Sequence, residues 1–263
     1  MRDPEASGPD ERWEALAEAF VEGAYGTVKG QVRTYVLHEQ LLRHLPSPPA
    51  TVLDVGGGAA HQSLPLARLG YQVTVLDPSA AMLAKARQRL SAETEVVRRR
   101  VRLLQAEGQN AAQAVAGETF GAVLCHGVLM YLEQPGPMVE SLCRCLSPGG
   151  VVSVMALNAK TLAVRPALER RWEDAMTALD ATEEVGVLGT HTRADTVERL
   201  SELMRQAHVD PLAWYGVWLF VDWLDLPLDS TDVTAVAALE LAASLRDPYR
   251  QLSRVFHLVG RRP

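Results

Sequence analysis

The residues with the clearest chemical meaning are the run Asp54-Val55-Gly56-Gly57-Gly58 and Asp77, which follows Gly58 by 19 residues. Residues 51–53, Thr-Val-Leu, predict a short buried strand before the glycines, and residues 71–76 predict a second strand that ends at Asp77. Glycines between a strand and a helix let a ligand approach the backbone, where the helix start offers free N–H groups. A carboxylate that ends the second strand can accept hydrogen bonds from both hydroxyls of a ribose. The pattern therefore predicts a nucleoside site.

Two positions in this segment distinguish between nucleotides. A pyrophosphate-binding turn has the form G-x-G-x-x-G, but His61 stands where the last glycine would be. Asp54, directly before the glycines, would repel a pyrophosphate and would suit an ammonium group. S-adenosyl-L-methionine (SAM) carries an ammonium, a carboxylate and a ribose, and it has no phosphate. The sequence thus favours SAM over a nicotinamide dinucleotide.

The elements that position this segment alternate between strand and helix. Further strands are expected at residues 101–104, 122–125 and 151–155, with helical segments between them. Such alternation predicts an α/β fold with a doubly wound, mostly parallel sheet and right-handed crossovers.

Outside this core we expect helical additions within a single domain of residues 1–263. The expected parts are an N-terminal helical cover (1–49), the SAM-binding core (50–156), a cap insertion (157–212) and a C-terminal strand pair (213–263). The apolar spacing predicts helices at residues 13–21 and 161–179. Asp195 and Glu198 form a D-x-x-E pattern typical of a helix start, and residues 214–223 read as an aromatic strand.

Composition excludes several classes of protein. With 26 basic and 32 acidic residues the formal net charge is −6, which argues against a protein that coats nucleic acid. Three cysteines are too few for a disulfide scaffold, and no run is apolar for long enough to predict a membrane span or a secretory signal. The histidines and cysteines show no metal-ligand spacing. We expect a cytoplasmic protein without a metal site.

The core residues resemble the class I SAM-dependent methyltransferases. The resemblance rests on the D-x-G-G-G turn, Asp77, residues 105–109, Cys125-His126, and the turn of residues 146–150. It implies SAM as cofactor, methyl transfer as the reaction, and a Rossmann-like sheet of seven strands closed by an antiparallel pair.

Residues 25–33, His126 and the C-terminal tail also look similar to the bacterial enzymes that methylate 5-carboxymethoxyuridine in tRNA. That resemblance implies cofactor contacts from Arg33, Gly56, Gly57, Asp77, Gly108, Gln109 and His126. The full set of expected cofactor-binding residues is Tyr25, Lys29, Arg33, Asp54, Gly56, Gly57, Gly58, Asp77, Met82, Gly108, Gln109 and His126.

The cap sequence indicates what kind of molecule accepts the methyl group. Where the similar tRNA enzymes carry a lysine-rich run, residues 180–192 contain three acids and no Lys or Arg. Phosphate binding requires cations, so we expect a small organic acceptor in preference to tRNA. Methylation of the carboxyl group of wobble 5-carboxymethoxyuridine in tRNA, and SAM binding without catalysis, are the alternatives. Tyr131 and His191 are the candidate catalytic residues.

Overall fold

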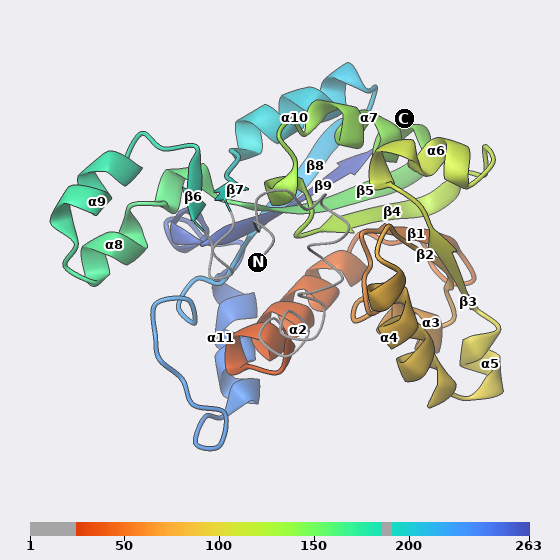
Figure 1. The fold of residues 1–263 in the computed structure, drawn as a ribbon, viewed down its shortest axis with the longest axis horizontal. Coiled ribbons are helices and arrows are strands. Elements are labelled where there is room, and N and C mark those ends of the chain that lie inside the picture. The colour runs from red at the N-terminus through yellow and green to blue at the C-terminus, as the bar shows by residue number, and fades with distance from the viewer. Residues whose placement is uncertain (1–24, 186–190) are drawn as a thin grey trace, which may run out of the picture.

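In the computed structural model, residues 25–185 and 191–263 are described, and they form a central sheet with helices on both faces (Figure 1). The sheet has the strand order β3-β2-β1-β4-β5-β9-β8. Its strands are β1 (Thr51–Val55), β2 (Gln72–Asp77), β3 (Val101–Gln105), β4 (Phe120–His126), β5 (Leu146–Leu157), β8 (Asp210–Val217) and β9 (Val255–Arg261).

Strands β1 to β5 run parallel to one another, whereas β9 runs antiparallel to both β5 and β8. Four consecutive residues of β1, 52–55, are buried, as expected for a parallel strand that helices cover on both faces. The sheet of seven strands with an antiparallel pair at its C-terminal end confirms the predicted fold class.

The helices form a layer on each face of the sheet. They are α2 (Val28–Leu42), α3 (Ser63–Arg68), α4 (Ala80–Ser91), α5 (Glu95–Arg98), α6 (Ala111–Ala114), α7 (Gly136–Arg144), α8 (Val164–Leu168), α9 (Trp172–Ala178), α10 (Val197–Gln206) and α11 (Val233–Ala243). In Figure 1, α6, α7 and α10 lie above the sheet, and α2, α3, α4 and α11 lie below it. No helix in the described ranges is both long and apolar enough to cross a membrane.

The strand order reverses between β2 and β4, which flank β1 on opposite sides. In open α/β sheets a crevice forms at the carboxyl ends of the strands at such a reversal, and ligands bind there. The turn that follows β1 and the end of β4 both lie at this crevice.

The cap departs from the helix expected at residues 161–179. Helices α8 and α9 form two short pieces that project from the body, separated by Arg170 with φ of 62° (Figure 1). A left-handed residue interrupts a right-handed helix, so the continuous helix is wrong. The cap also contains a hairpin of β6 (Glu183–Val185) and β7 (His191–Arg193).

Two further expectations are wrong in detail. The side chain that caps α10 belongs to Thr196, whose oxygen accepts from the Arg199 N–H, while Asp195 forms an ion pair with Arg193 at 2.6 Å. The aromatic strand expected at 214–223 ends at Val217, because Trp218 adopts a positive φ of 60° that no strand accommodates. The helix expected at residues 13–21 lies outside the described residues.

Candidate functional site

The glycines after β1 are required by packing as well as by conformation. Gly56 and Gly58 have φ of 70° and 52°, in the left-handed region that favours glycine. A Cβ atom on Gly56 would lie 2.3 Å from Cγ2 of Val128, and one on Gly57 would lie 2.8 Å from the carboxyl group of Asp54. The chain passes so close to its neighbours here that no larger residue fits without rearrangement.

Asp77 joins this turn to the start of α4. Its Oδ2 accepts from the Gly58 N–H at 2.9 Å, and its Oδ1 accepts from the Ser79 N–H at 2.9 Å. Ser79 in turn caps α4 by accepting from the Met82 N–H. A Cβ atom on Gly58 would lie 2.7 Å from Cε of Met82, so Met82 covers the turn. A carboxylate oxygen has two lone pairs, so Asp77 is also suited to accept from a ribose hydroxyl.

Asp54 holds the turn from its other side. It is buried, and its Oδ2 accepts from the Ser63 hydroxyl at 2.5 Å. Burial raises the pKa of Asp54 to about 6; the hydrogen bond from Ser63 opposes this rise and the negative charge of Asp77 adds to it. The carboxylate therefore ties β1 to the beginning of α3.

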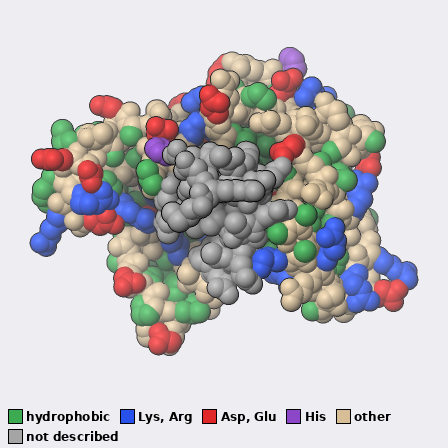
Figure 2. Space-filling view, in the orientation of Figure 1, with side chains coloured by type: hydrophobic (Ala, Val, Ile, Leu, Met, Phe, Trp, Pro, Cys, Tyr) green, Lys and Arg blue, Asp and Glu red, His purple; other side chains and the backbone are tan. Residues whose placement is uncertain are grey.

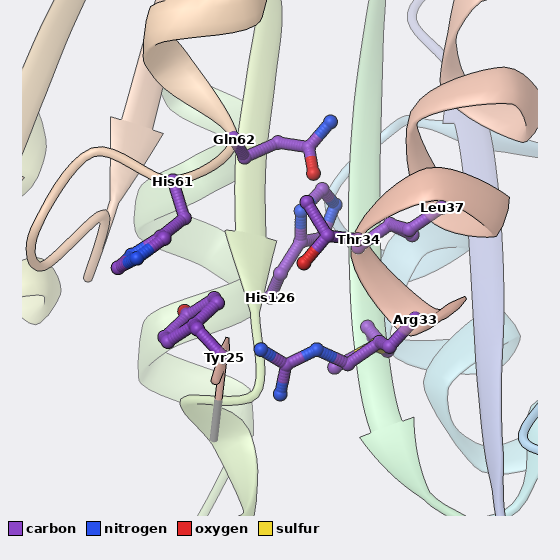
Figure 3. A pocket seen from close by; sticks show the side chains of 8 residues that line it. Tyr25, Arg33, Thr34, Leu37, His61, Gln62 and His126 are labelled. Atoms are coloured by element: carbon purple, nitrogen blue, oxygen red, sulfur yellow. The ribbon is translucent and has the colours of Figure 1, made fainter. Parts of the chain in front are cut away.

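A pocket opens between α2 and the carboxyl ends of β1 and β4 (Figure 3). The residues that line it come from α2 and the segment before it, from the turn after β1, and from the ends of β4 and β5. They are Tyr25, Arg33, Thr34, Leu37, His61, Gln62, His126 and Met155. The structure thus brings three of the predicted cofactor residues, Tyr25, Arg33 and His126, to one cavity.

Rings and a cation are stacked along one wall of the pocket. The His61 ring lies parallel to the Tyr25 ring, with centroids 3.5 Å apart and an interplanar angle of 5°. The Arg33 guanidinium lies 4.5 Å from the centroid of the Tyr25 ring, within cation–π range. Burial lowers the pKa of His61 to about 3, with the charges of Arg89 and Arg33 adding to the effect. Sequence reasoning missed His61 as a pocket residue, although it follows the glycine turn directly.

His126 faces α2 from the end of β4 (Figure 3). Burial lowers its pKa to about 3, and the charge of Arg33 contributes to the shift. Its Nε2 lies 2.8 Å from Oγ of Ser153, while its Nδ1 is buried and has no hydrogen-bond partner among the described residues. A neutral imidazole with one bare nitrogen therefore lines the pocket.

Lys29 lies one helical turn from Arg33, and both cations lie near the Trp218 ring, but Lys29 also forms an ion pair away from the pocket. Its ammonium lies 4.2 Å from the centroid of a Trp218 ring and forms an ion pair with Asp222. Asp222 also pairs with Arg165 at 2.8 Å and lies 3.8 Å from Arg254.

Arg254 in turn pairs with Glu184 of the cap. We call Lys29, Arg165, Glu184, Asp222 and Arg254 the charge cluster. Burial lowers the pKa of Lys29, although Asp222 opposes the shift. Of this cluster the sequence indicated only Lys29, because its members come from distant segments.

Four of the predicted residues, Gly108, Gln109, Tyr131 and His191, belong neither to the pocket lining nor to the charge cluster. A Cβ atom on Gly108 would lie 2.6 Å from Met138, and Gln109 next to it is exposed. Tyr131 is half-buried; burial raises its pKa, and the charge of Arg33 opposes this rise. His191 is exposed on β7. Neither Tyr131 nor His191 is among the residues that line the pocket.

No group of three or more His, Cys, Asp or Glu side chains suited to a metal ion occurs within residues 25–185 and 191–263. The polar groups of the described residues that line the pocket are instead a guanidinium, two imidazoles, two hydroxyls and an amide. Together with the ribose acceptors of Asp77 this set fits SAM, which combines an amino-acid end with a nucleoside.

Comparison with known proteins gives the class of this chain. Residues 53–154 match the family model described as a methyltransferase domain. With the seven-stranded sheet and its glycine turn, the match supports a SAM-dependent methyltransferase, with SAM as cofactor.

Individual relatives add detail. The chain is 28% identical to the tRNA 5-carboxymethoxyuridine methyltransferase of Escherichia coli O157:H7 over 97% of each protein. It is 34% identical to the ubiquinone biosynthesis O-methyltransferase of Methylobacterium nodulans over 44% of each. The fold resembles the glycopeptide N-methyltransferase MtfA complexed with SAM, with a TM-score of 0.59, 16% identity, and coverage of 88% of this chain and 94% of that one.

Proposed function

We propose that this protein transfers the methyl group of SAM to the carboxylate of a small organic acid, which binds beneath the part of the cap that holds α8, α9, β6 and β7. The observation that carries the proposal is the charge cluster. Three cations, Lys29, Arg165 and Arg254, converge there on two carboxylates. Nη1 of Arg254 is buried without a hydrogen-bond partner in the described part of the chain. The excess of positive charge favours an anionic group of the acceptor.

The cofactor supplies an electrophilic methyl group on a sulfonium. The residues proposed to hold it are Arg33 for the methionine carboxylate, Asp77 for the ribose and the glycine turn for the chain between them. Methyl transfer is an in-line displacement, so the protein contributes position and exclusion of water.

A carboxylate acceptor agrees with the acid–base properties of the pocket. A carboxylic acid is already ionised at neutral pH, so no base must remove a proton at the attack step. The pKa values of His61 and His126, each lowered to about 3, make both imidazoles weak bases. The raised pKa of Tyr131 keeps its hydroxyl protonated, so we propose that Tyr131 donates a hydrogen bond to the acceptor. His191 remains a second candidate for that role.

A second candidate acceptor is the carboxyl group of 5-carboxymethoxyuridine in tRNA. It is favoured by the similarity to the E. coli tRNA enzyme, which runs over 97% of both chains. Cations and acids are intermingled on the surface of the cap, at the left of Figure 2. Arg170 and Arg171 of the cap are exposed. A mixed surface of this kind gives less support to a polyanion than a basic groove would. SAM binding without turnover is a third possibility.

Turnover with methyl-labelled SAM tests these alternatives. The protein is incubated with a panel of small carboxylic acids, with bulk tRNA and without acceptor. Label in a small product that is released as methanol by mild base identifies a carboxyl methyl ester and supports the proposal. Base-labile label in tRNA supports the second candidate. Label that resists base contradicts a carboxylate acceptor, and tight SAM binding without incorporation supports the third possibility.

A variant pair locates the acceptor. Arg165→Ala removes a cation of the charge cluster, and Arg171→Ala removes an exposed cation of the same cap. The proposal requires a higher KM for the acceptor in the first variant only, with SAM affinity unchanged in both.

A further inference from the structure

A line of buried polar side chains leads from the pocket across the sheet to α2. His126 Nε2 lies 2.8 Å from Ser153 Oγ on β5, and Ser153 Oγ lies 2.7 Å from His257 Nε2 on β9. His257 Nδ1 lies 2.9 Å from Gln40 Oε1, and Gln40 Nε2 lies 3.2 Å from the carbonyl oxygen of Gly216. Ser153, His257 and Gln40 are fully buried. A polar chain inside an apolar core is costly unless each member is satisfied.

The Gly216 carbonyl at the end of this chain determines which atom donates and which accepts in each of its hydrogen bonds. The Gly216 carbonyl can only accept, so it receives the Gln40 amide N–H, and Gln40 Oε1 must accept from His257 Nδ1–H. Burial lowers the pKa of His257 well below its usual value, and the nearby His126 and His44 add to the shift. The ring is therefore neutral, and its Nε2 accepts from the Ser153 hydroxyl.

The same reasoning fixes the donor and the acceptor in the hydrogen bond between Ser153 and His126, which lines the pocket. Because the Ser153 proton points to His257, the Ser153 oxygen accepts from His126 Nε2–H. A neutral His126 then carries no proton on Nδ1, the atom that is buried without a partner among the described residues. Arg33, the cation of α2 that lines the same pocket, disfavours a second proton on this ring. Nδ1 is thus fixed as a hydrogen-bond acceptor.

We propose that Gln40, His257 and Ser153 are positioning residues, which hold His126 in the tautomer that accepts a hydrogen bond from the ammonium group of SAM. A cation and a neutral acceptor in one cavity complement an amino-acid end, since Arg33 can pair with its carboxylate and His126 Nδ1 with its ammonium. This inference rests on the placement of SAM in the proposed function.

The test compares two ligands and two serine variants by calorimetry. The ligands are S-adenosylhomocysteine and an analogue that keeps the carboxylate but lacks the amino group. Ser153→Ala frees the His126 tautomer and is expected to weaken S-adenosylhomocysteine about tenfold while leaving the analogue unchanged. The matched control is Ser141→Ala on α7, which removes a buried hydroxyl that has no hydrogen-bond partner in the described ranges; it should weaken neither ligand.

Nitrogen NMR of the imidazoles gives a readout that packing alone would not move. The wild type should show His126 with a protonated Nε2 and a bare Nδ1, and Ser153→Ala should show a mixture of tautomers. Equal weakening of both ligands by Ser153→Ala, or a protonated Nδ1 in the wild type, would overturn the inference. If Arg33→Ala leaves S-adenosylhomocysteine binding unchanged, the placement of the cofactor has failed instead.

Discussion

The turn between β1 and α3 differs from the charge cluster in how far along the chain its contacts reach. The turn connects Asp54, Gly58 and Asp77, which belong to two consecutive βα units. The cluster connects Lys29 near the start of the described chain with Arg254 near its end. The turn is built by close packing, and the cluster by charges that must find one another in the folded state. We infer that the first region fixes the common cofactor, while the second can vary to select an acceptor.

The cluster depends on Asp222, whose side chain is fully buried and meets three cations. Asp222→Ala leaves these cations without their shared partner, so we expect the free energy of unfolding to fall by about 3–5 kcal/mol. Denaturant unfolding measures the change. Glu169→Ala, which breaks an exposed pair with Arg171, is the control and should cost about 0–1 kcal/mol. Similar losses in both variants would show that the cluster is no more than a surface network.

Replacing a glycine in the turn after β1 should destabilise the protein, because the added side chain has no room. Gly56→Ala places a methyl group 2.3 Å from Val128 and forces alanine into a positive φ, which together should cost about 2–4 kcal/mol of stability. Gly136→Ala is the control, because a Cβ atom there meets its nearest neighbour at an ordinary 3.8 Å. Thermal unfolding of both variants measures the difference, and a fully stable Gly56→Ala would refute the packing requirement.

Asp54 predicts how the turn responds to pH. Its pKa is raised from 3.8 to about 6, so the folded state binds this proton more tightly than the unfolded chain. The contribution of Asp54 to stability is then greatest below pH 3.8 and falls as the pH rises to about 6, by at most about 3 kcal/mol.

Unfolding free energies measured between pH 3.5 and 7 for the wild type and Asp54→Asn test this expectation. The variant should lack this fall. Parallel profiles would mean that Asp54 titrates alike in both states.

Asp77 links the turn to ligand binding. Asp77→Ala removes both proposed ribose acceptors and leaves the Gly58 and Ser79 N–H groups without their partner. The affinity for SAM should fall by about 1.5–3 kcal/mol. Calorimetry measures it, and Asp77→Asn should lose less because one oxygen remains. Unchanged affinity in the alanine variant would remove Asp77 from the site.

Local signals explain which features the sequence predicts. The strand before the glycines and the turn after it arise from residues within a few positions of one another, and the structure contains both. Long-range contacts override local preference elsewhere. Asp195, expected to cap α10, instead bridges to Asn158: its N–H donates to the Leu157 carbonyl oxygen, and its own carbonyl accepts from the Ala159 N–H.

Other features have no local signal. Trp218 leaves the strand conformation, and its indole N–H donates to the Lys29 carbonyl oxygen, 189 residues away. The chain from His126 to Gln40 likewise joins residues from four elements. No spacing in the sequence indicates such partners, because only the topology of the sheet brings them together.

The most direct test of the account is a crystal structure of the protein with S-adenosylhomocysteine. We predict that the ligand lies at the carboxyl ends of β1, β2 and β4, with its ribose hydroxyls on Asp77 and its carboxylate on Arg33. The sulfur should point toward the cap and the charge cluster. A ligand bound away from the glycine turn, or one whose carboxylate does not meet Arg33, would contradict the proposed site.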